Sequence, residues 1–343
     1  MDSFPEQIDL GLRLPTIQNQ TIFFAVLNWG LGHATRSIPI IDDLMQNGNE
    51  IILFSDGEGG NLLQETFPQL RYHTLTSYNV RYDSKYVLIG LLGQFYKAPK
   101  LLRQENREVS HYYDLYKPSI IISDNRYGCY HSGCANYLIT HQLLVISQNS
   151  FLRNLTKWYI NNLLKKFTEI WIPDFKELGL SNAMSSVEID VPKRYIGFCA
   201  PRVSQAIHSE VLILLSGPES RRSLVEAMYH KAIKGSTKKI VFIAGNYLEP
   251  QRKSVSENIT YFSRLNYKDV LCYIAGADKI VCRSGYTTLI DLFCLGKKNI
   301  VCVPTADQPE QEYLADYWTK KGWISMITEN EIESKLPKLL EST

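Results

Sequence analysis

A glycine-rich turn that carries a histidine follows the first apolar run of the sequence. Gly30, Gly32, His33 and Arg36 lie in the segment GLGHATR, directly after the run TIFFAVL. Glycines let the backbone turn tightly, and free N–H groups at the start of the next helix favour anions or polarised oxygens. An imidazole with a pKa of about 6.5 can take a proton from a substrate. The turn therefore predicts acid–base chemistry, although Thr35 replaces the third glycine of a dinucleotide-binding fingerprint.

Polar residues also follow two later apolar runs of the N-terminal half. The segment DNR follows the run SIIIS, and the pair HQ follows the run YLIT. Carboxyl ends of parallel strands meet at one edge of a sheet, so these residues should lie near His33. Either His33 or Asp124 could serve as a general base. The other polar residues and glycines of this edge are expected to bind an acceptor: Gly30, Gly32, Arg36, Asn125, Arg126, His141 and Gln142.

A second glycine turn opens the C-terminal half. The segment SGPES, residues 216–220, follows the apolar run VLILL and leads into a predicted helix. Backbone N–H groups at a helix start could hold a diphosphate, and Arg221 or Arg222 could add positive charge. The residues of this turn that we expect to contact the phosphate-bearing ligand are Gly217, Glu219 and Ser220.

The third motif gives the strongest signal. Residues 282–288 (CRSGYTT) follow an apolar run and open a predicted helix, in which Asp291 lies one turn beyond Thr288. A carboxylate there could accept hydrogen bonds from a vicinal diol such as that of ribose. After the next strand, residues 304–312 (PTADQPEQE) add amides and carboxylates, which suit the hydroxyls of a sugar. The predicted ligand contacts are Arg283, Ser284, Gly285, Asp291, Gln308, Gln311 and Glu312.

Alternating strands and helices must position these motifs. Apolar runs predict buried strands, and helical spacing of apolar residues separates them, which indicates parallel sheets. We expect an α/β protein with two successive doubly wound, Rossmann-like domains. The predicted divisions are an irregular extension at 1–20, an N-terminal domain at 21–205 and a C-terminal domain at 206–343, whose last helix could pack back on the N-terminal domain.

Composition agrees with an ordinary globular protein. The chain has 343 residues, which suggests about two domains, and its net charge is +2, which argues against a strongly basic nucleic-acid-binding protein. Seven scattered cysteines indicate reduced thiols in a cytoplasmic protein. Residues 1–20 lack the features of a signal peptide, and no apolar run reaches the roughly 18 residues of a membrane span. Residues 87–103 could form an amphipathic helix at the inner membrane surface.

The two C-terminal motifs, Arg283-Ser284-Gly285 through Asp291 and Pro304 through Glu312, resemble those of family-28 glycosyltransferases. This family includes the N-acetylglucosaminyltransferase that acts on the lipid-linked peptidoglycan precursor. The turn at 30–36 is similar to the family's N-terminal loop, although that loop is richer in glycine. The resemblance implies the two-domain GT-B fold with an interdomain cleft. It also implies inverting transfer of a sugar from a UDP-sugar to a hydroxyl acceptor, without a metal or another cofactor.

The resemblance also assigns roles to residues. Asp291 takes the place of a Glu that binds the ribose hydroxyls, and Gln311 that of a Gln that contacts the donor sugar. Glu312 stands where the family often has a second Gln. Arg202 lies near the place of an arginine that meets the diphosphate, and residues 216–220 replace the phosphate loop. The remaining carry-overs are Ser263, within the segment that reads the base, and His33, which matches the histidine of the N-terminal loop.

Two other functions remain open. The first is a UDP-N-acetylglucosamine 2-epimerase-like isomerase, but Asp307-Gln308-Pro309-Glu310 stands where those enzymes usually carry a Glu-Arg-Pro-Glu run. The second is a catalytically idle protein that binds a nucleotide sugar. Retaining transferases carry two glutamates separated by seven residues, and Arg283 at the corresponding position before Asp291 argues against that class.

Overall fold

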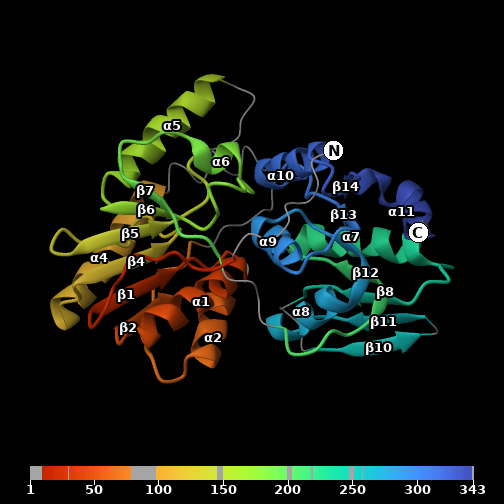
Figure 1. Ribbon diagram of the computed structural model, residues 1–343, viewed down its shortest axis with the longest axis horizontal. Helices are drawn as coiled ribbons and strands as arrows, with labels where there is room; N and C mark the ends of the chain where they lie inside the picture. Colours follow the sequence, from red (N-terminus) through yellow and green to blue (C-terminus); the bar gives the residue numbers. More distant parts are fainter. Residues whose placement is uncertain are drawn as a thin grey trace. The chain divides into compact units, whose positions relative to one another are not determined.

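The chain forms two compact α/β units, each built on a seven-stranded sheet (Figure 1). This computed structural model describes residues 10–29, 31–78, 98–144, 150–198, 203–217, 219–246, 251–256 and 258–341. The N-terminal unit comprises the described residues up to 198, and the C-terminal unit those from 203 onward. Two doubly wound parallel-sheet units are the architecture that the sequence predicts.

The N-terminal sheet is parallel throughout, in the order β3-β2-β1-β4-β5-β6-β7. Its central strands are buried on both faces. Phe24 packs in the hydrophobic cluster that includes helix α1, whereas Phe23 belongs to the cluster that includes Val109 of α4. This double burial explains why the strands read as continuous apolar runs. The elements are β1 (Thr21–Val26), α1 (Gly32–Gln46), β2 (Glu50–Ser55), α2 (Gly57–Thr66), β3 (Arg71–Thr74), α4 (Ala98–Tyr116), β4 (Ile120–Asp124), β5 (Ala135–Ile139), α5 (Ser150–Leu164), β6 (Glu169–Ile172), α6 (Ala183–Ser186) and β7 (Lys193–Tyr195).

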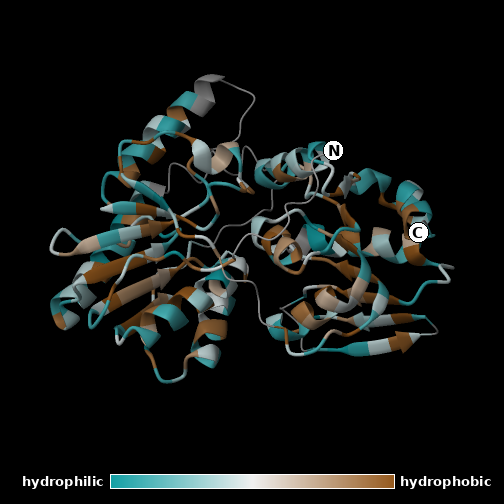
Figure 2. Cartoon of the chain, in the orientation of Figure 1, coloured by the Kyte–Doolittle hydropathy of each residue, from teal (hydrophilic) through white to brown (hydrophobic). Residues whose placement is uncertain are grey.

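The C-terminal sheet has the order β10-β11-β9-β8-β12-β13-β14, and its strands are parallel except for the edge pair β10–β11. Figure 2 shows hydrophobic strands in the interior of both sheets. The elements are β8 (Ser209–Leu214), α7 (Glu219–Ile233), β9 (Ile240–Ile243), β10 (Lys253–Ser256), β11 (Ile259–Phe262), α8 (Tyr267–Gly276), β12 (Ala277–Cys282), α9 (Tyr286–Cys294), β13 (Ile300–Cys302), α10 (Pro309–Lys320), β14 (Ser325–Met326), η1 (Glu329–Glu331) and α11 (Ile332–Glu341).

Two segments lie elsewhere than the sequence suggests. The described part of the expected N-terminal extension packs on the first unit: Ile17 is buried in its core, and Leu12 forms a β-bridge with Gly197. Residues 203–205, expected in the N-terminal domain, belong with the C-terminal unit. The last helix, α11, packs on α7 of its own unit through Leu336 and Leu340.

No helix within the described ranges is both long and apolar enough to cross a membrane. The segment 87–103 falls largely outside the described residues, and only its last part is seen, as the first turns of α4.

Candidate functional site

The predicted motifs lie at the carboxyl ends of the strands where each sheet reverses its winding direction. In the N-terminal sheet the reversal lies between β1 and β4, which are neighbours although a long segment separates them in sequence. His33 follows β1, and Asp124 is the last residue of β4. Ligands of doubly wound sheets bind at such reversal points, so the topology itself brings these two residues to a binding edge.

Helix α1 presents three polar side chains to the carboxylate of Asp124. His33 Nδ1 lies 2.7 Å from Oδ1, Arg36 Nε donates to Oδ2 at 2.7 Å, and the Ser37 hydroxyl donates to Oδ2 at 3.1 Å. Arg36 Nη2 also donates to Oδ1. Residues three and four apart share one face of a helix, so this period explains the grouping of the three side chains. The same period could have identified Ser37, which sequence reasoning missed.

The electrostatics of this cluster separate the two candidate bases. Burial alone would raise the pKa of Asp124, but the adjacent Arg36 and His33 lower it well below its usual range. Asp124 has no exposed surface, so the prediction that it could take the acceptor's proton directly is wrong for this conformation. Its carboxylate instead accepts hydrogen bonds, and it stabilises positive charge on the imidazole.

The His33 imidazole has the geometry of a base that a carboxylate orients. His33 Nδ1 lies 2.7 Å from Asp124 Oδ1, which can only accept, and 2.8 Å from Arg36 Nη2, which can only donate. When the ring proton lies on Nδ1 and points to Asp124, the lone pair is on Nε2. No described residue hydrogen-bonds Nε2, and the side chain keeps 13% of its surface exposed. Burial lowers the pKa of His33, Arg36 lowers it further, and Asp124 opposes the shift. The imidazole is therefore neutral at neutral pH and can accept a proton.

The other acceptor-side candidates occupy different environments. Arg36 donates to His141 Nδ1 at 3.1 Å, which joins His141 to the cluster. Asn125 has a left-handed backbone (φ 59°), and its buried Oδ1 has no hydrogen-bond partner among the described residues. Gln142 follows His141 and is half-buried. Gly32 begins α1, whereas Gly30 lies outside the described residues.

Arg126 does not reach the binding edge. It is fully buried and forms ion pairs with Asp56 (2.8 Å) and Glu105 (2.6 Å), and its guanidinium also donates to the carbonyl of Thr76. The prediction that Arg126 contacts an acceptor is therefore wrong, because its guanidinium is engaged by partners inside the core. Its role is to join the ends of β2 and β4 to α4.

Two helix starts lie at the reversal point of the C-terminal sheet, which falls between β8 and β12. Gly217 precedes α7 with φ 116°, a backbone conformation that side chains disfavour, and Glu219 and Ser220 form the first turn of that helix. Gly285 precedes α9, and an added Cβ there would meet no atom within 4 Å. Arg202, expected near the diphosphate, lies outside the described residues.

Arg283 and Ser284 are engaged within the C-terminal unit. Arg283 is 3% exposed, pairs with Glu329 at 2.8 Å and donates to the carbonyl of Val303 at 2.9 Å. Its predicted contact with a ligand would require this ion pair to open. Ser284 donates to the backbone carbonyl of Gln311 at 2.8 Å, so it ties the two C-terminal motifs together.

The amides of the second motif shape their own loop. Gln308 caps α10 by accepting the N–H of Gln311 at 2.8 Å, and Gln311 Oε1 accepts the N–H of Thr305 at 2.9 Å. Glu312 accepts the N–H of Asp307, which has a left-handed backbone, at 3.0 Å. These side chains therefore fix the loop at the carboxyl end of β13, and Gln311 uses its carbonyl oxygen to do so.

Asp291 and Ser263 lie at the same edge of the C-terminal sheet. Asp291 is 8% exposed, and Tyr267 donates to its Oδ1 at 2.8 Å. Burial raises the pKa of Asp291 to about 7, against the effect of the Tyr267 hydrogen bond. Ser263 is buried, and its hydroxyl accepts the N–H of Arg252 at 2.8 Å. Sequence reasoning missed Tyr267, and its spacing from Asp291 offered no signal.

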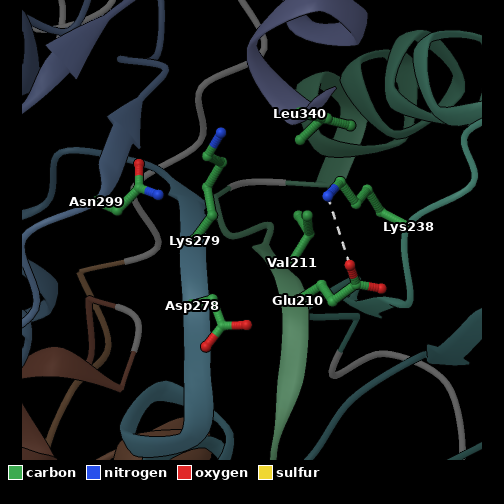
Figure 3. Close-up of a pocket in the computed structure, with 7 residues that line it drawn as sticks. All are labelled: Glu210, Val211, Lys238, Asp278, Lys279, Asn299 and Leu340. Carbon is green, nitrogen blue, oxygen red and sulfur yellow. Dashed lines mark ion pairs between the residues drawn. The ribbon is translucent and has the colours of Figure 1, made fainter. Parts of the chain in front are cut away.

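A hollow of about 200 Å³ lies at the opposite edge of the C-terminal sheet (Figure 3). Residues at the beginnings of β8 and β12 line this hollow. The lining carries charges of both signs, which include the ion pair of Lys238 and Glu210 at 3.5 Å. None of the predicted site residues lines it. Within the described ranges, no group of three or more His, Cys, Asp and Glu side chains is arranged to hold a metal ion.

Known proteins are similar to this chain. The model of the glycosyltransferase family 28 C-terminal domain matches residues 212–343. An uncharacterised glycosyltransferase of Methanosarcina mazei is 22% identical over 342 residues, which cover 90% of this chain and 85% of that protein. The UDP-N-acetylglucosamine–N-acetylmuramyl-(pentapeptide) pyrophosphoryl-undecaprenol N-acetylglucosamine transferase of Caldanaerobacter subterraneus is 21% identical over 327 residues, covering 89% and 85%.

The fold is similar to that of solved glycosyltransferases. The crystal structure of the kitacinnamycin glycosyltransferase superposes with a TM-score of 0.67 at 13% identity, covering 95% of this chain and 92% of that one. The family match spans the unit that holds Asp291 and the loop of Gln311, and both curated relatives extend over the N-terminal unit as well. Residues 212–343 therefore match a glycosyltransferase family 28 C-terminal domain, and the protein is a glycosyltransferase of the GT-B fold.

Proposed function

We propose that this glycosyltransferase moves a sugar, an N-acetylhexosamine or a hexose, from a UDP-sugar to a hydroxyl acceptor with inversion at the anomeric carbon. The observation that carries the proposal is the cluster of His33, Asp124 and Arg36 at the reversal point of the N-terminal sheet. It supplies one oriented, neutral base, which is what a single direct displacement requires.

The reaction follows from the groups at the two sheet edges. The acceptor oxygen attacks the anomeric carbon while the bond from that carbon to the diphosphate breaks. His33 Nε2 takes the acceptor's proton, and the carboxylate of Asp124 stabilises the imidazolium that forms. The departing diphosphate gains negative charge, which the N–H groups at the starts of α7 and α9 would stabilise.

We assign donor binding to the C-terminal unit and expect it to need no metal or other cofactor. Asp291, Gln311 and Gly285 lie at one edge of a domain that matches the family model. The name of the Caldanaerobacter relative includes UDP-N-acetylglucosamine, which supports a uridine nucleotide here. Arg202, Ser263 and residues 216–220 are assigned to this site by the family resemblance alone.

Calorimetric titration tests the donor assignment. Titrants are UDP, UDP-N-acetylglucosamine, UDP-glucose, GDP and TDP, with Asp291→Asn as the site variant. We expect selective binding of uridine nucleotides and an affinity about 10- to 100-fold lower in the variant, since a hydrogen bond to a charged group contributes about 1.5–3 kcal/mol. Unchanged affinity in Asp291→Asn would remove this residue from the site, and failure of every nucleotide to bind would contradict donor binding altogether.

The product distinguishes transfer from the two open alternatives. Incubation with the bound UDP-sugar and candidate hydroxyl acceptors should yield UDP and a glycoside of inverted anomeric configuration, which NMR can identify. Release of an epimerised sugar nucleotide would indicate an isomerase instead. Donor binding without any turnover, across lipid-linked, glycan and small-molecule acceptors, would indicate a binding protein.

We further propose that the enzyme acts in the cytoplasm, on a lipid-linked or cell-surface glycan acceptor, and contacts the membrane peripherally. All six described cysteines are free thiols, which supports a reducing compartment. Helix α5 exposes Leu155 (48%) and Trp158 (65%) one turn apart, beside the exposed Lys157. Exposed aromatic and basic side chains on one helix suit an anionic lipid surface.

Co-sedimentation with vesicles containing anionic lipid tests this contact. Loss of binding in the double variant Leu155→Ala and Trp158→Ala, with retention in Leu224→Ala, is the expected result. Leu224 is a matched control because it is 59% exposed on α7 of the other unit. Equal sedimentation of the double variant and the wild type would exclude α5 as the contact.

A further inference from the structure

Two arginines share one carboxylate at the carboxyl edge of the C-terminal sheet. Arg221 donates to Glu329 Oε2 from Nε at 3.0 Å and from Nη2 at 2.5 Å. Arg283 Nη1 lies 2.8 Å from the other oxygen, Oε1. Arg221 belongs to the first turn of α7, Arg283 directly follows β12, and Glu329 begins η1 after β14. Three chain segments therefore meet at the Glu329 carboxylate.

The cluster of Arg221, Arg283 and Glu329 carries one more positive charge than negative. Among the described residues, no second carboxylate forms an ion pair with either arginine, and Asp307, whose charge also acts on Arg221, is exposed to water. Arg283 Nε and Glu329 Oε1 are fully buried and lack a hydrogen-bond partner within that part of the chain. One carboxylate thus satisfies the two guanidinium groups only in part, and the excess charge favours an anion.

The two arginines at the start of α7 differ in what they can contact. Arg222 is 2% exposed and donates to Glu226 at 2.8 Å and to the carbonyl of Ala244 at 3.2 Å. Arg221 keeps 34% of its side chain exposed, and its Nη1 has no hydrogen-bond partner in the described segments. Of these two cations, Arg221 is therefore the one that can bind a ligand at this edge.

We propose that Glu329 is a positioning residue of the transfer reaction, which holds Arg221 so that Nη1 contacts the diphosphate of the donor as this group departs. The inference rests on the proposed function. The Arg221 guanidinium would add a full positive charge to the partial charge at the start of α7, where negative charge develops in the transition state. Arg283 stays in its ion pair and acts through its charge alone.

The fold itself fixes the carboxylate that holds Arg221. A capping box between Thr328 and Glu331, whose carboxylate accepts the Thr328 N–H at 2.9 Å, sets where η1 begins and so places Glu329. A guanidinium held through two nitrogens has lost most of its rotamer freedom before a ligand arrives. Charge thus comes from Arg221 and its position from Glu329, so substitutions can separate the two.

Two neutral substitutions in the full-length protein make this separation. Arg221→Gln removes the charge, so calorimetry should show about 10-fold weaker binding of UDP and unchanged binding of uridine, which carries no phosphate. Glu329→Gln keeps both arginines and removes the opposing charge, so UDP should bind as well as before or better. Release of UDP from the UDP-sugar at saturating donor should nevertheless fall in both variants, by about 10- to 100-fold.

A second substitution and a matched control complete the set. Arg221→Lys keeps the charge without the paired donors, so it should retain most of the UDP affinity and still lose turnover. Lys231→Gln removes a cation from the last turn of the same helix, where Lys231 forms an exposed ion pair with Glu333 at 3.2 Å. This control should change neither UDP affinity nor turnover.

The outcomes separate this inference from the proposed function. Unchanged UDP affinity in Arg221→Gln, with the melting temperature of the wild type, would overturn the inference and leave the donor site intact. Weaker UDP binding in Glu329→Gln, or full turnover in that variant, would overturn the part given to Glu329. A wild-type protein that neither binds UDP nor releases it from a UDP-sugar would contradict the proposed function itself, and the inference with it.

Discussion

At the scale of single residues, His33 is the group whose loss should affect chemistry most selectively. His33→Ala removes the base but no described contact of the C-terminal unit. We expect turnover to fall by about 10²- to 10⁴-fold, the usual contribution of a general base, with UDP affinity unchanged. Steady-state kinetics and calorimetry on one preparation measure both quantities. Full activity in the variant would assign the proton to another group.

The pH profile should report the ionisation of His33. The imidazole must be neutral to accept a proton, and burial lowers its pKa below the usual 6.5. Turnover should therefore remain constant through neutral pH and decline only as the pH falls through the lowered pKa. Asp124→Asn removes a group that raises this pKa, so the decline should begin at a still lower pH while the overall rate drops. A loss of turnover that begins above pH 7 as the pH is lowered would contradict this assignment.

The sequence identifies polar residues at the carboxyl edges of both sheets, but it does not show which of them reach the binding edge and which are buried in the core. Arg36 and Arg126 both lie within three residues of a strand end or turn, yet Arg36 reaches the binding edge and Arg126 is buried in the core. Their difference depends on Asp56 and Glu105, which lie far from Arg126 in sequence. Tyr267 escaped notice for the same reason, since only tertiary structure brings it to Asp291.

At the scale of elements, the buried ion pairs of Arg126 should control the stability of the N-terminal unit. They join the end of β2, helix α4 and the loop after β4. Arg126→Met leaves Asp56 and Glu105 without their cation, and breaking a buried pair in this way costs about 3–5 kcal/mol. The free energy of unfolding, measured with denaturant, should fall by that amount.

An exposed ion pair supplies the control for this prediction. Arg194→Ala breaks the pair with Glu169, in which the arginine is 46% exposed, and should change the free energy of unfolding by about 1 kcal/mol or less. Equal effects of the two substitutions would show that burial does not govern the contribution of Arg126.

The elements that could be predicted are those with their own apolar pattern. β1 and β4 are continuous apolar runs, and α9 follows a clear turn signal, so their positions agree with the sequence analysis. β3 (RYHT) and β10 (KSVS) carry no such pattern, because they lie at sheet edges and bury little. Their strand conformation comes from pairing with β2 and β11, which local sequence does not encode.

At the scale of the whole molecule, we predict a reaction that needs no metal. The positive ends of α7 and α9 are present in the fold itself, so chelation should not remove the groups that stabilise the diphosphate. We expect EDTA to leave the initial rate of transfer unchanged and added Mg²⁺ to leave it nearly the same. A loss of activity that Mg²⁺ or Mn²⁺ restores would contradict this expectation.

Both sheets end in short edge strands. β3 and β10 have four residues, β7 three and β14 two, and β10 is exposed along its whole length. A strand edge presents unpaired N–H and C=O groups that a second chain can pair with, and the number of such groups sets how readily it does so. Parallel sheets pair slowly during folding, so incompletely folded chains meet one another often. The short edges should therefore limit aggregation while the protein folds, a property that would be lost by lengthening β14 or β7 with apolar residues.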